Sequence, residues 1–426
     1  MHVRAMADHQ TDPWSGSPPV PPDRGDFYDL LSLLLTEQRT LLADMRRYLE
    51  SDVAPIIADH WERGEFPTAI VPALAKLNLA GSKFTGHGCA GYGELFHGLL
   101  MVELARIDPS LAIFFGGHDA LGMGTIALCG SEEQKQRWLP SMARLEKIGA
   151  FALAEPDVGS DAARGLATTA HRDGDTWVLN GRKKWIGNAT WSDLTVVWAR
   201  DEDDGQVKGF VVERGTPGFT KEKMHGKTAL RIMQNAQITL DGCRVPEADR
   251  LQDANSFADT ARVLRATRLM VAWQAAGTGR GAFEHALANA TRRSQFGRPI
   301  ARFQQVQDLL ARMLANTTAS LTMCVRLAEL AQAGEMREEQ VSLAKMYCTT
   351  ATREDLRLGP RGARRQRRAA RPPCDPLHQR RRGHLQLRGH PRDQRSDRRA
   401  GAHGHTGVRL TVTWAARAPS CRHGRR

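Results

Sequence analysis

The sequence lacks the features that mark membrane, secreted and metal-binding proteins. No apolar run approaches the roughly 20 residues that a membrane span needs, and residues 1–23 are polar and proline-rich, without the apolar centre of a signal peptide. The seven cysteines are scattered, without the paired spacing of a metal site or a disulfide framework. We therefore expect reduced thiols, no metal, no membrane partner and a cytoplasmic location.

Positive charge is confined to one end of the chain. The formal net charge of +13 would ordinarily suggest a nucleic-acid partner. Residues 353–426, however, hold 21 arginines, no lysine and 5 acidic residues, which leaves 39 basic and 42 acidic residues in the first 352. Because this larger part is mildly acidic, we predict no nucleic-acid partner. A nucleic-acid-binding protein that acts through its arginine-rich tail is the least favoured alternative.

The spacing of apolar residues divides the chain into three folded regions of class α+β. Apolar residues recur every three or four positions in residues 27–150 and again in 251–354, whereas residues 151–250 alternate with a period of two. These periods predict an N-terminal α-helical domain, a middle antiparallel β domain and a C-terminal helical bundle. The proline-rich residues 1–26 and the arginine-rich residues 355–426 are predicted to be disordered, which leaves the bundle incomplete.

Three motifs in this order resemble the acyl-CoA dehydrogenase family. They are ALAEPDVGSD at 152–161, GRKKWIGNATWSDLTVVWAR at 181–200 and RRSQFGRPIARFQQVQ at 292–307. The phrases ALRIMQN and RLMVAWQ resemble the glutaryl-CoA dehydrogenase and short-chain acyl-CoA oxidase branch. The resemblance implies an FAD-dependent homotetramer that oxidises an acyl-CoA thioester to a trans-2-enoyl-CoA and passes electrons to an electron-transfer flavoprotein. An oxidase that uses O2 and a non-catalytic flavin-binding remnant remain alternatives.

The resemblance also implies a set of flavin contacts. A strand followed by Glu-Pro and Gly-Ser-Asp places backbone N–H groups and the Ser160 hydroxyl at a strand end, although such a segment alone could be an ordinary turn. Trp185 would lie against the flavin ring, and Arg293 and Phe296 would reach the adenosine pyrophosphate of a neighbouring subunit. Ser160 and Arg268 are expected at the substrate. The expected cofactor-binding residues are Phe151, Ala154, Ser160, Trp185, Gly187, Asn188, Arg293, Gln295, Phe296 and Gln304.

Three positions depart from the family pattern. Ala154 stands where the family usually has Thr or Ser, and Gly187 stands where many members have Thr, although backbone amides can serve at both positions. Ala112 stands where glutaryl-CoA dehydrogenases carry an arginine for the distal carboxylate. A dicarboxylic substrate would leave that charge unpaired in a buried pocket. We therefore expect a plain short or medium acyl thioester, without decarboxylation.

The C-terminal segment is predicted to be out of frame. The family's GGNG and YEGT strings are absent, yet residues 383–395 (GHLQLRGHPRDQR) have a coding sequence that gives AIYSYEGTREIN when it is read one nucleotide later. The same shift makes RRQR at 364–367 compatible with GGNG. Two motifs recovered in one frame at family spacing indicate a frameshift that begins between Arg353 and Arg361.

The frameshift removes the catalytic base. The glutamate codon is split between Arg388 and Gly389, and an arginine side chain stays protonated and cannot accept the α-proton. Some relatives place the base on the helix that carries ATRLMVAW, but there this chain has Thr267, next to Arg268, which matches a supporting family arginine. We predict that the base position is empty. This would be contradicted if another carboxylate, such as Glu155 or Asp119, pointed into the site.

Overall fold

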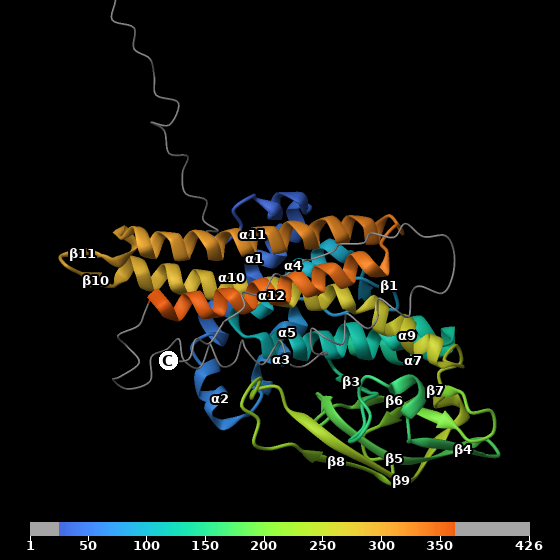
Figure 1. Ribbon diagram of the computed structural model, residues 1–426. Coiled ribbons are helices and arrows are strands. Elements are labelled where there is room, and N and C mark those ends of the chain that lie inside the picture. The colour runs from blue at the N-terminus through green and yellow to red at the C-terminus, as the bar shows by residue number, and fades with distance from the viewer. Residues whose placement is uncertain (1–24, 363–426) are drawn as a thin grey trace, which may run out of the picture.

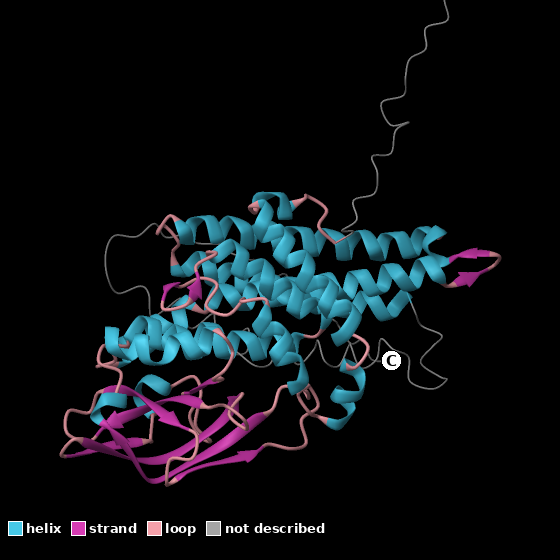
Figure 2. Cartoon of the chain, turned by 180° about the vertical axis from the view of Figure 1, so that it is seen from behind, coloured by secondary structure: helices cyan, strands magenta, loops and turns pink. Residues whose placement is uncertain are grey.

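The computed structural model describes residues 25–362, which form two helical regions and, between them in sequence, one large β-sheet. Figure 1 shows the long C-terminal helices side by side on one side of the molecule, and the large sheet as a separate layer on the other. Figure 2, from behind, shows the same two layers. Helices of the N-terminal region lie between them, so residues from all three regions can meet at one place.

The N-terminal region is helical, as predicted. Ser131 caps α7 through a reciprocal pair of hydrogen bonds with Gln134, and Asp108 caps α5 by accepting from the Ser110 amide. Two segments, η2 and η4, are π-helical, and η4 continues α5 directly into α6. The elements are η1 (Leu30–Leu33), α1 (Thr36–Tyr48), η2 (Leu49–Val53), α2 (Ile57–Arg63), η3 (Thr68–Ile70), α3 (Val71–Lys76), β1 (Thr85–Gly86), β2 (Cys89–Ala90), α4 (Glu94–Ile107), α5 (Pro109–Gly116), η4 (Gly117–Met123), α6 (Gly124–Cys129) and α7 (Glu132–Ala143).

The middle region is a seven-stranded sheet with the order β3-β6-β4-β5-β9-β8, in which β7 pairs with β6. Most pairs are antiparallel, as expected, but β6 runs parallel to both β3 and β4. The parallel β3–β6 pair is possible because α8, β4 and β5 form the crossover between these strands. The elements are β3 (Gly149–Ala152), α8 (Ala162–Gly165), β4 (Thr169–Asp173), β5 (Thr176–Gly187), β6 (Leu194–Asp201), β7 (Val207–Glu213), β8 (Phe219–Lys223), β9 (Asn235–Pro246) and η5 (Glu247–Asp249).

The C-terminal region is built around three long helices. A small hairpin projects from the end of α10 and leads into α11, beyond the end of the bundle (Figure 1). The elements are α9 (Phe257–Ala266), α10 (Arg268–Arg292), β10 (Ser294–Gln295), β11 (Arg298–Pro299), η6 (Ile300–Arg302), α11 (Gln304–Gln332) and α12 (Glu338–Gly362). Helix α12 thus continues past the predicted boundary at 354, because Leu356 and Leu358 are buried and Leu358 packs against Phe283 and Met313.

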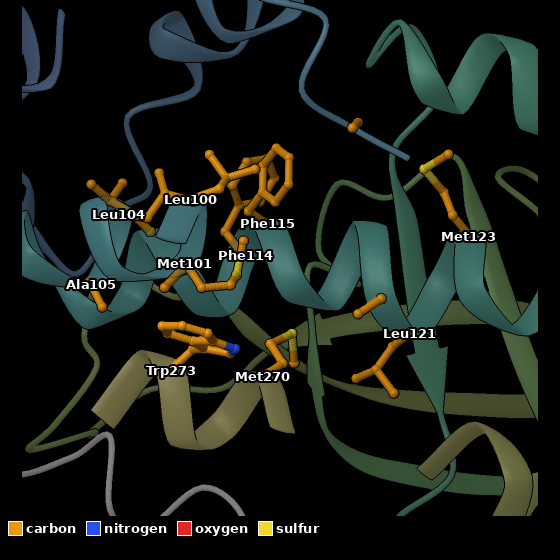
Figure 3. Close-up of a cluster of buried hydrophobic side chains, with 14 of the residues drawn as sticks. Leu100, Met101, Leu104, Ala105, Phe114, Phe115, Leu121, Met123, Met270 and Trp273 are labelled. Atoms are coloured by element: carbon orange, nitrogen blue, oxygen red, sulfur yellow. The ribbon is translucent and has the colours of Figure 1, made fainter. Parts of the chain in front are cut away.

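One hydrophobic core joins the two helical regions. Trp273 and Met270 of α10 point toward α4 and α5, where Met101 and Phe114 lie (Figure 3). Small residues allow this close approach, since a Cβ atom on Gly98 would overlap the Trp273 ring. Because α10 is packed so tightly here, the side chains at its N-terminal end have fixed positions relative to α5.

The expectation that no apolar run approaches the length of a membrane span is wrong. Among the described residues, the helix at Pro109–Cys129 is long and apolar enough to cross a membrane, and 72% of the tested window is buried inside the protein. Two polar residues, His118 and Asp119, interrupt the run in the sequence.

The predicted lead (1–26) and tail (355–426) lie mostly outside the described residues. Cys374 and Cys421 also lie outside them, whereas the other five cysteines are free thiols.

Candidate active site

A cavity of about 120 Å³ lies where the three regions meet. Its walls come from the N-terminal helices, from three segments of the β domain and from α10. The lining residues are Ile113, Gly117, Leu121, Phe151, Trp185, Gly187, Met233, Asn235, Met270, Val271 and Gln274. None of them is ionisable, so the cavity can hold an apolar group, while its backbone amides and the side chains of Asn235 and Gln274 can face a polar part of the same ligand.

Trp185 is presented to this cavity by an irregularity in β5. The pairing of β5 with β9 shifts register between Lys183 and Ile186, and Trp185 has a left-handed backbone with φ 64°. Left-handed geometry costs a non-glycine residue about 1–2 kcal/mol, so other contacts must hold it. Asn235 supplies one by donating from Nδ2 to the Trp185 carbonyl over 3.0 Å. The indole is left 51% exposed, which is unusual for a tryptophan.

The residues after Trp185 bring backbone close to the cavity. A Cβ atom on Gly187 would overlap the end of the Met233 side chain, so glycine allows the two walls to approach. Asn188 is buried with φ 63° and donates from Nδ2 to the carbonyls of Phe114 at 3.0 Å and Gly149 at 3.2 Å. Its Oδ1 is buried and accepts no hydrogen bond from the described residues. Asn188 thus joins β5 to α5 and β3 and keeps one acceptor available.

The π-helix η4 forms another wall. Gly117 and Leu121 line the cavity, while His118 points away from it, accepting from the Gly149 amide through Nδ1 and bonding the Met142 carbonyl through Nε2, both at 3.0 Å. Burial lowers the pKa of His118 to about 4, so its ring is neutral at pH 7. A π-helical segment is uncommon and frequently occurs at functional sites. Here it lets His118 bond to β3 while its neighbours face the cavity.

Helix α10 forms a further wall of the cavity. Gln274 lies three residues after Val271 and four after Met270, so the three side chains share one face of the helix. Gln274 is buried and donates from Nε2 to the carbonyl of Ala112 over 3.0 Å. This bond fixes the Gln274 side chain at the cavity wall.

The two carboxylates that could have replaced the base point elsewhere. Glu155 is engaged by Lys183, Thr168 and the Ala167 amide. Asp119 accepts from the Gly81 amide and lies 3.3 Å from Nδ1 of His97, and burial raises its pKa to about 6. Neither residue lines the cavity. Within residues 25–362 the cavity therefore has no general base.

The predicted cofactor-binding residues fall into two separate groups. Phe151, Trp185 and Gly187 line the cavity, Asn188 lies buried beside it, and Ala154 and Ser160 lie on the loop after β3, outside the lining. At the other end of α10 are Arg293, Gln295, Phe296 and Gln304. The 25 residues of this helix span about 37 Å at about 1.5 Å per residue. These four residues therefore cannot reach the same cavity in one chain.

Two further predicted positions lie at the start of α10. Arg268 is half-buried two residues before Met270, and its Nη1 lies 3.4 Å from Oε2 of Glu338 on α12. Thr267 is buried and donates to the Leu264 carbonyl over 3.0 Å. Neither residue is part of the cavity lining.

The sequence contained a signal for several residues that were not assigned to the site. ALRIMQN carries Met233 and Asn235, and RLMVAWQ carries Met270, Val271 and Gln274. Both phrases served only as markers of a family branch. Ile113, Gly117 and Leu121 had no such signal, because nothing in an apolar helix distinguishes a cavity wall from core.

Solved structures with the same fold are similar to this chain along almost their whole length. A glutaryl-CoA dehydrogenase from Mycobacterium smegmatis is 34% identical with a TM-score of 0.82, and covers 89% of this chain and 97% of its own. A glutaryl-CoA dehydrogenase from the same organism, in complex with FADH2, is 29% identical with a TM-score of 0.83, covering 90% and 98%.

Curated relatives and family models agree with this similarity. An acyl-CoA dehydrogenase of Bacillus subtilis is 31% identical over 74% of this chain and 85% of its own, and the mouse mitochondrial short-chain specific acyl-CoA dehydrogenase is 32% identical over 72% and 75%. The acyl-CoA dehydrogenase N-terminal, middle and C-terminal domain models match residues 36–146, 150–243 and 257–361. The chain therefore belongs to the acyl-CoA dehydrogenase family of oxidoreductases.

Proposed function

We propose that the fold is that of an FAD-dependent acyl-CoA dehydrogenase for plain short or medium acyl thioesters, with the product a trans-2-enoyl-CoA. The observation that carries this proposal is the apolar cavity between α5, η4 and α10, with the half-exposed Trp185 on its β-domain wall. It combines a place for a flat aromatic cofactor with a place for an alkyl chain.

The residues around Trp185 fit a flavin. The exposed indole offers a surface for stacking, Gly187 permits close approach of a ring, and the buried Oδ1 of Asn188 lacks a hydrogen-bond donor among the described residues. Phe151 would add an apolar contact, and the backbone at Ala154 and the hydroxyl of Ser160 would supply polar ones. When bound, FAD supplies the acceptor for the hydride that leaves the acyl chain.

The cavity walls favour an uncharged acyl chain. Ile113, Leu121, Met270 and Val271 exclude water, and no cationic side chain among the lining residues could pair with a distal carboxylate. Ala112 is fully buried behind the wall and contributes only its carbonyl, to Gln274. These contacts support a plain thioester over a dicarboxylic one.

Removal of the α-proton needs a base that residues 25–362 do not provide at the cavity. The family position for this base falls at Arg388 and Gly389, outside the described residues, and no side chain there is a base. The C-terminal family model ends its match at residue 361, the end of the interval in which the frame change is predicted to begin. We therefore propose that the chain with this sequence binds flavin and thioester but lacks most of the family's activity, by about 10²–10⁴-fold or more.

We also propose a cytoplasmic homotetramer that passes electrons to an electron-transfer flavoprotein. Phe296 is 93% exposed at the tip of the β10–β11 hairpin, held there by left-handed backbone at both Phe296 and Gly297. Since the hairpin cannot reach its own cavity, a contact with a neighbouring copy would explain an aromatic side chain in that position. Among the similar structures is one titled an electron transferring flavoprotein of Acidaminococcus fermentans, 26% identical with a TM-score of 0.82.

One experiment tests the cofactor and the frame together. The gene is resequenced across codons 350–410, and the purified protein is examined for flavin absorbance and for bleaching by butyryl-CoA under anaerobic conditions. We expect flavin to be bound, with bleaching only in the chain whose frame has been restored. Peroxide formed on reoxidation would indicate an oxidase, and absence of flavin from both chains would overturn the proposal.

A further inference from the structure

We propose that Lys183 and Glu155 form a positioning pair that locks the loop after β3 onto β5, so that the two segments beside the flavin keep their relative position. The inference rests on the proposed flavin site. It assigns a function to two buried charged residues that do not line the cavity. Loss of the pair is expected to weaken flavin binding without unfolding the protein.

The pair is completely enclosed. Nζ of Lys183 lies 2.8 Å from Oε1 of Glu155, and the exposed fractions of the two side chains are 0% and 4%. Glu155 also accepts from the Ala167 amide at 2.8 Å, from the Thr168 amide at 3.0 Å and from the Thr168 hydroxyl at 2.6 Å. One carboxylate thus ties together three segments: the loop after β3, the approach to β4, and β5.

The pair acts directly on backbone that approaches the cofactor site. Lys183 donates a second hydrogen bond to the Leu153 carbonyl over 3.3 Å, and the Lys184 amide donates to the Ala154 carbonyl over 2.9 Å. Ala154, on the loop after β3, is an expected flavin contact. Trp185, another expected contact, lies on β5 inside its register shift. Movement of Lys183 would therefore move Ala154 and Trp185 relative to each other.

Energetics argue that the pair is not simply a source of stability. Transfer of both charges out of water is unfavourable, and replacing a buried ion pair with apolar residues of similar volume is often neutral or stabilising. Lys183 lies beside the apolar cluster of the sheet, where an unbranched side chain such as methionine would fit. What an apolar pair cannot supply is the set of directed hydrogen bonds to the loop.

The charge state of the pair agrees with this geometry. Burial would raise the pKa of Glu155, but the charge of Lys183 and the hydrogen bonds from Lys183, Thr168 and Ala167 outweigh it and hold the pKa below its usual value. Burial lowers the pKa of Lys183 to about 8 against the opposing effect of Glu155. At pH 7 both groups are therefore charged.

The test uses the double variant Lys183→Met/Glu155→Gln, which removes both charges and avoids the unpaired buried carboxylate that Lys183→Met alone would leave. The matched control is Lys208→Met/Asp201→Asn, which removes another largely buried lysine–carboxylate pair of the same sheet, between β7 and β6. The dissociation constant of FAD is measured by flavin fluorescence at pH 7. Hydrogen exchange of the Ala167 and Thr168 amides is measured on flavin-free protein.

We expect the Lys183/Glu155 variant to melt within a few degrees of the unmodified protein, to bind FAD at least about tenfold more weakly and to exchange both amides at least about tenfold faster. The control variant should bind FAD like the unmodified protein. Unchanged FAD affinity together with unchanged exchange overturns the inference. If the unmodified protein binds no FAD, the proposed function fails, and the exchange result alone decides whether the pair anchors the loop.

Discussion

Asn235 donates from Nδ2 to the backbone carbonyl of Trp185 over 3.0 Å and so holds the tryptophan in a left-handed conformation at the cavity wall. The Asn235 side chain is itself oriented by Lys227, whose Nζ donates to Oδ1 over 2.7 Å. Asn235, fifty positions after Trp185 in the chain, thereby determines how the Trp185 ring faces the site. This dependence makes the presentation of Trp185 sensitive to substitution on another strand.

Asn235→Ala should release Trp185. Without the hydrogen bond, the cost of the left-handed backbone, about 1–2 kcal/mol, loses one of the contacts that offset it, so the bulge in β5 is expected to relax and the ring to move. FAD affinity should fall by about tenfold, measured by flavin fluorescence. Gln237→Ala, two residues further along β9, is the control and should bind FAD normally. Equal affinity in both variants would show that Asn235 does not control the ring.

Gln274→Ala should lengthen the acyl cavity. The side chain forms part of the α10 wall, so its truncation opens space for additional methylene groups, each worth about 0.8 kcal/mol when buried. The affinity for octanoyl-CoA relative to butyryl-CoA is expected to rise by about tenfold, measured from the change in flavin absorbance on binding. His285→Ala changes an exposed position on the same helix and should leave the ratio unaltered. No change in the ratio for Gln274→Ala would place the end of the acyl chain elsewhere.

Asp355→Asn should alter the pH dependence of stability. Burial raises the pKa of Asp355 to about 8, whereas an unfolded aspartate has a pKa near 3.9, so between these values the folded chain holds a proton that the unfolded chain has lost. Stability from this residue is complete below about pH 4 and falls with rising pH, at about 1.4 kcal/mol per unit at most. Asparagine should remove this slope and keep a polar partner for Asn316, which donates to Asp355 over 2.9 Å.

Urea unfolding at pH 5 and pH 8 measures the effect. The unmodified protein should lose stability between these values, and Asp355→Asn should lose less. Glu335→Gln, at an exposed position before α12, is the control for the change of one charge. An identical pH slope in the unmodified protein and Asp355→Asn would mean that Asp355 is ionised in the folded chain.

Gly98→Ala should destabilise the junction of α4 and α10. A Cβ atom at this position would overlap the Trp273 ring, which is held in the core and cannot rotate away. Overpacking of this kind costs about 1–3 kcal/mol, more than the roughly 1 kcal/mol that alanine gains over glycine in a helix. Thermal unfolding should show a lower Tm, whereas Gly359→Ala on α12, where a Cβ would meet only Met313 at 3.7 Å, should be neutral or slightly stabilising.

The three regions of the fold and the family could be predicted from local sequence. The change of apolar spacing from helical to alternating and back predicted the three regions, because side-chain direction repeats with the local backbone geometry. The motifs around Trp185 and Arg293 identified the family before any fold was known. Local sequence also indicated that the base position, at Arg388 and Gly389, holds no base, although these residues lie outside the part of the chain that the structure describes.

Only tertiary structure decided which residues share a site. Trp185 and Phe296 both belong to motifs with an expected flavin contact, yet the length of α10 separates them, and only one of them faces the cavity of its own chain. Glu155 is excluded as a base because Lys183 and Thr168 hydrogen-bond to its carboxylate. These outcomes depend on contacts between residues far apart in the chain, about which the local period carries no information.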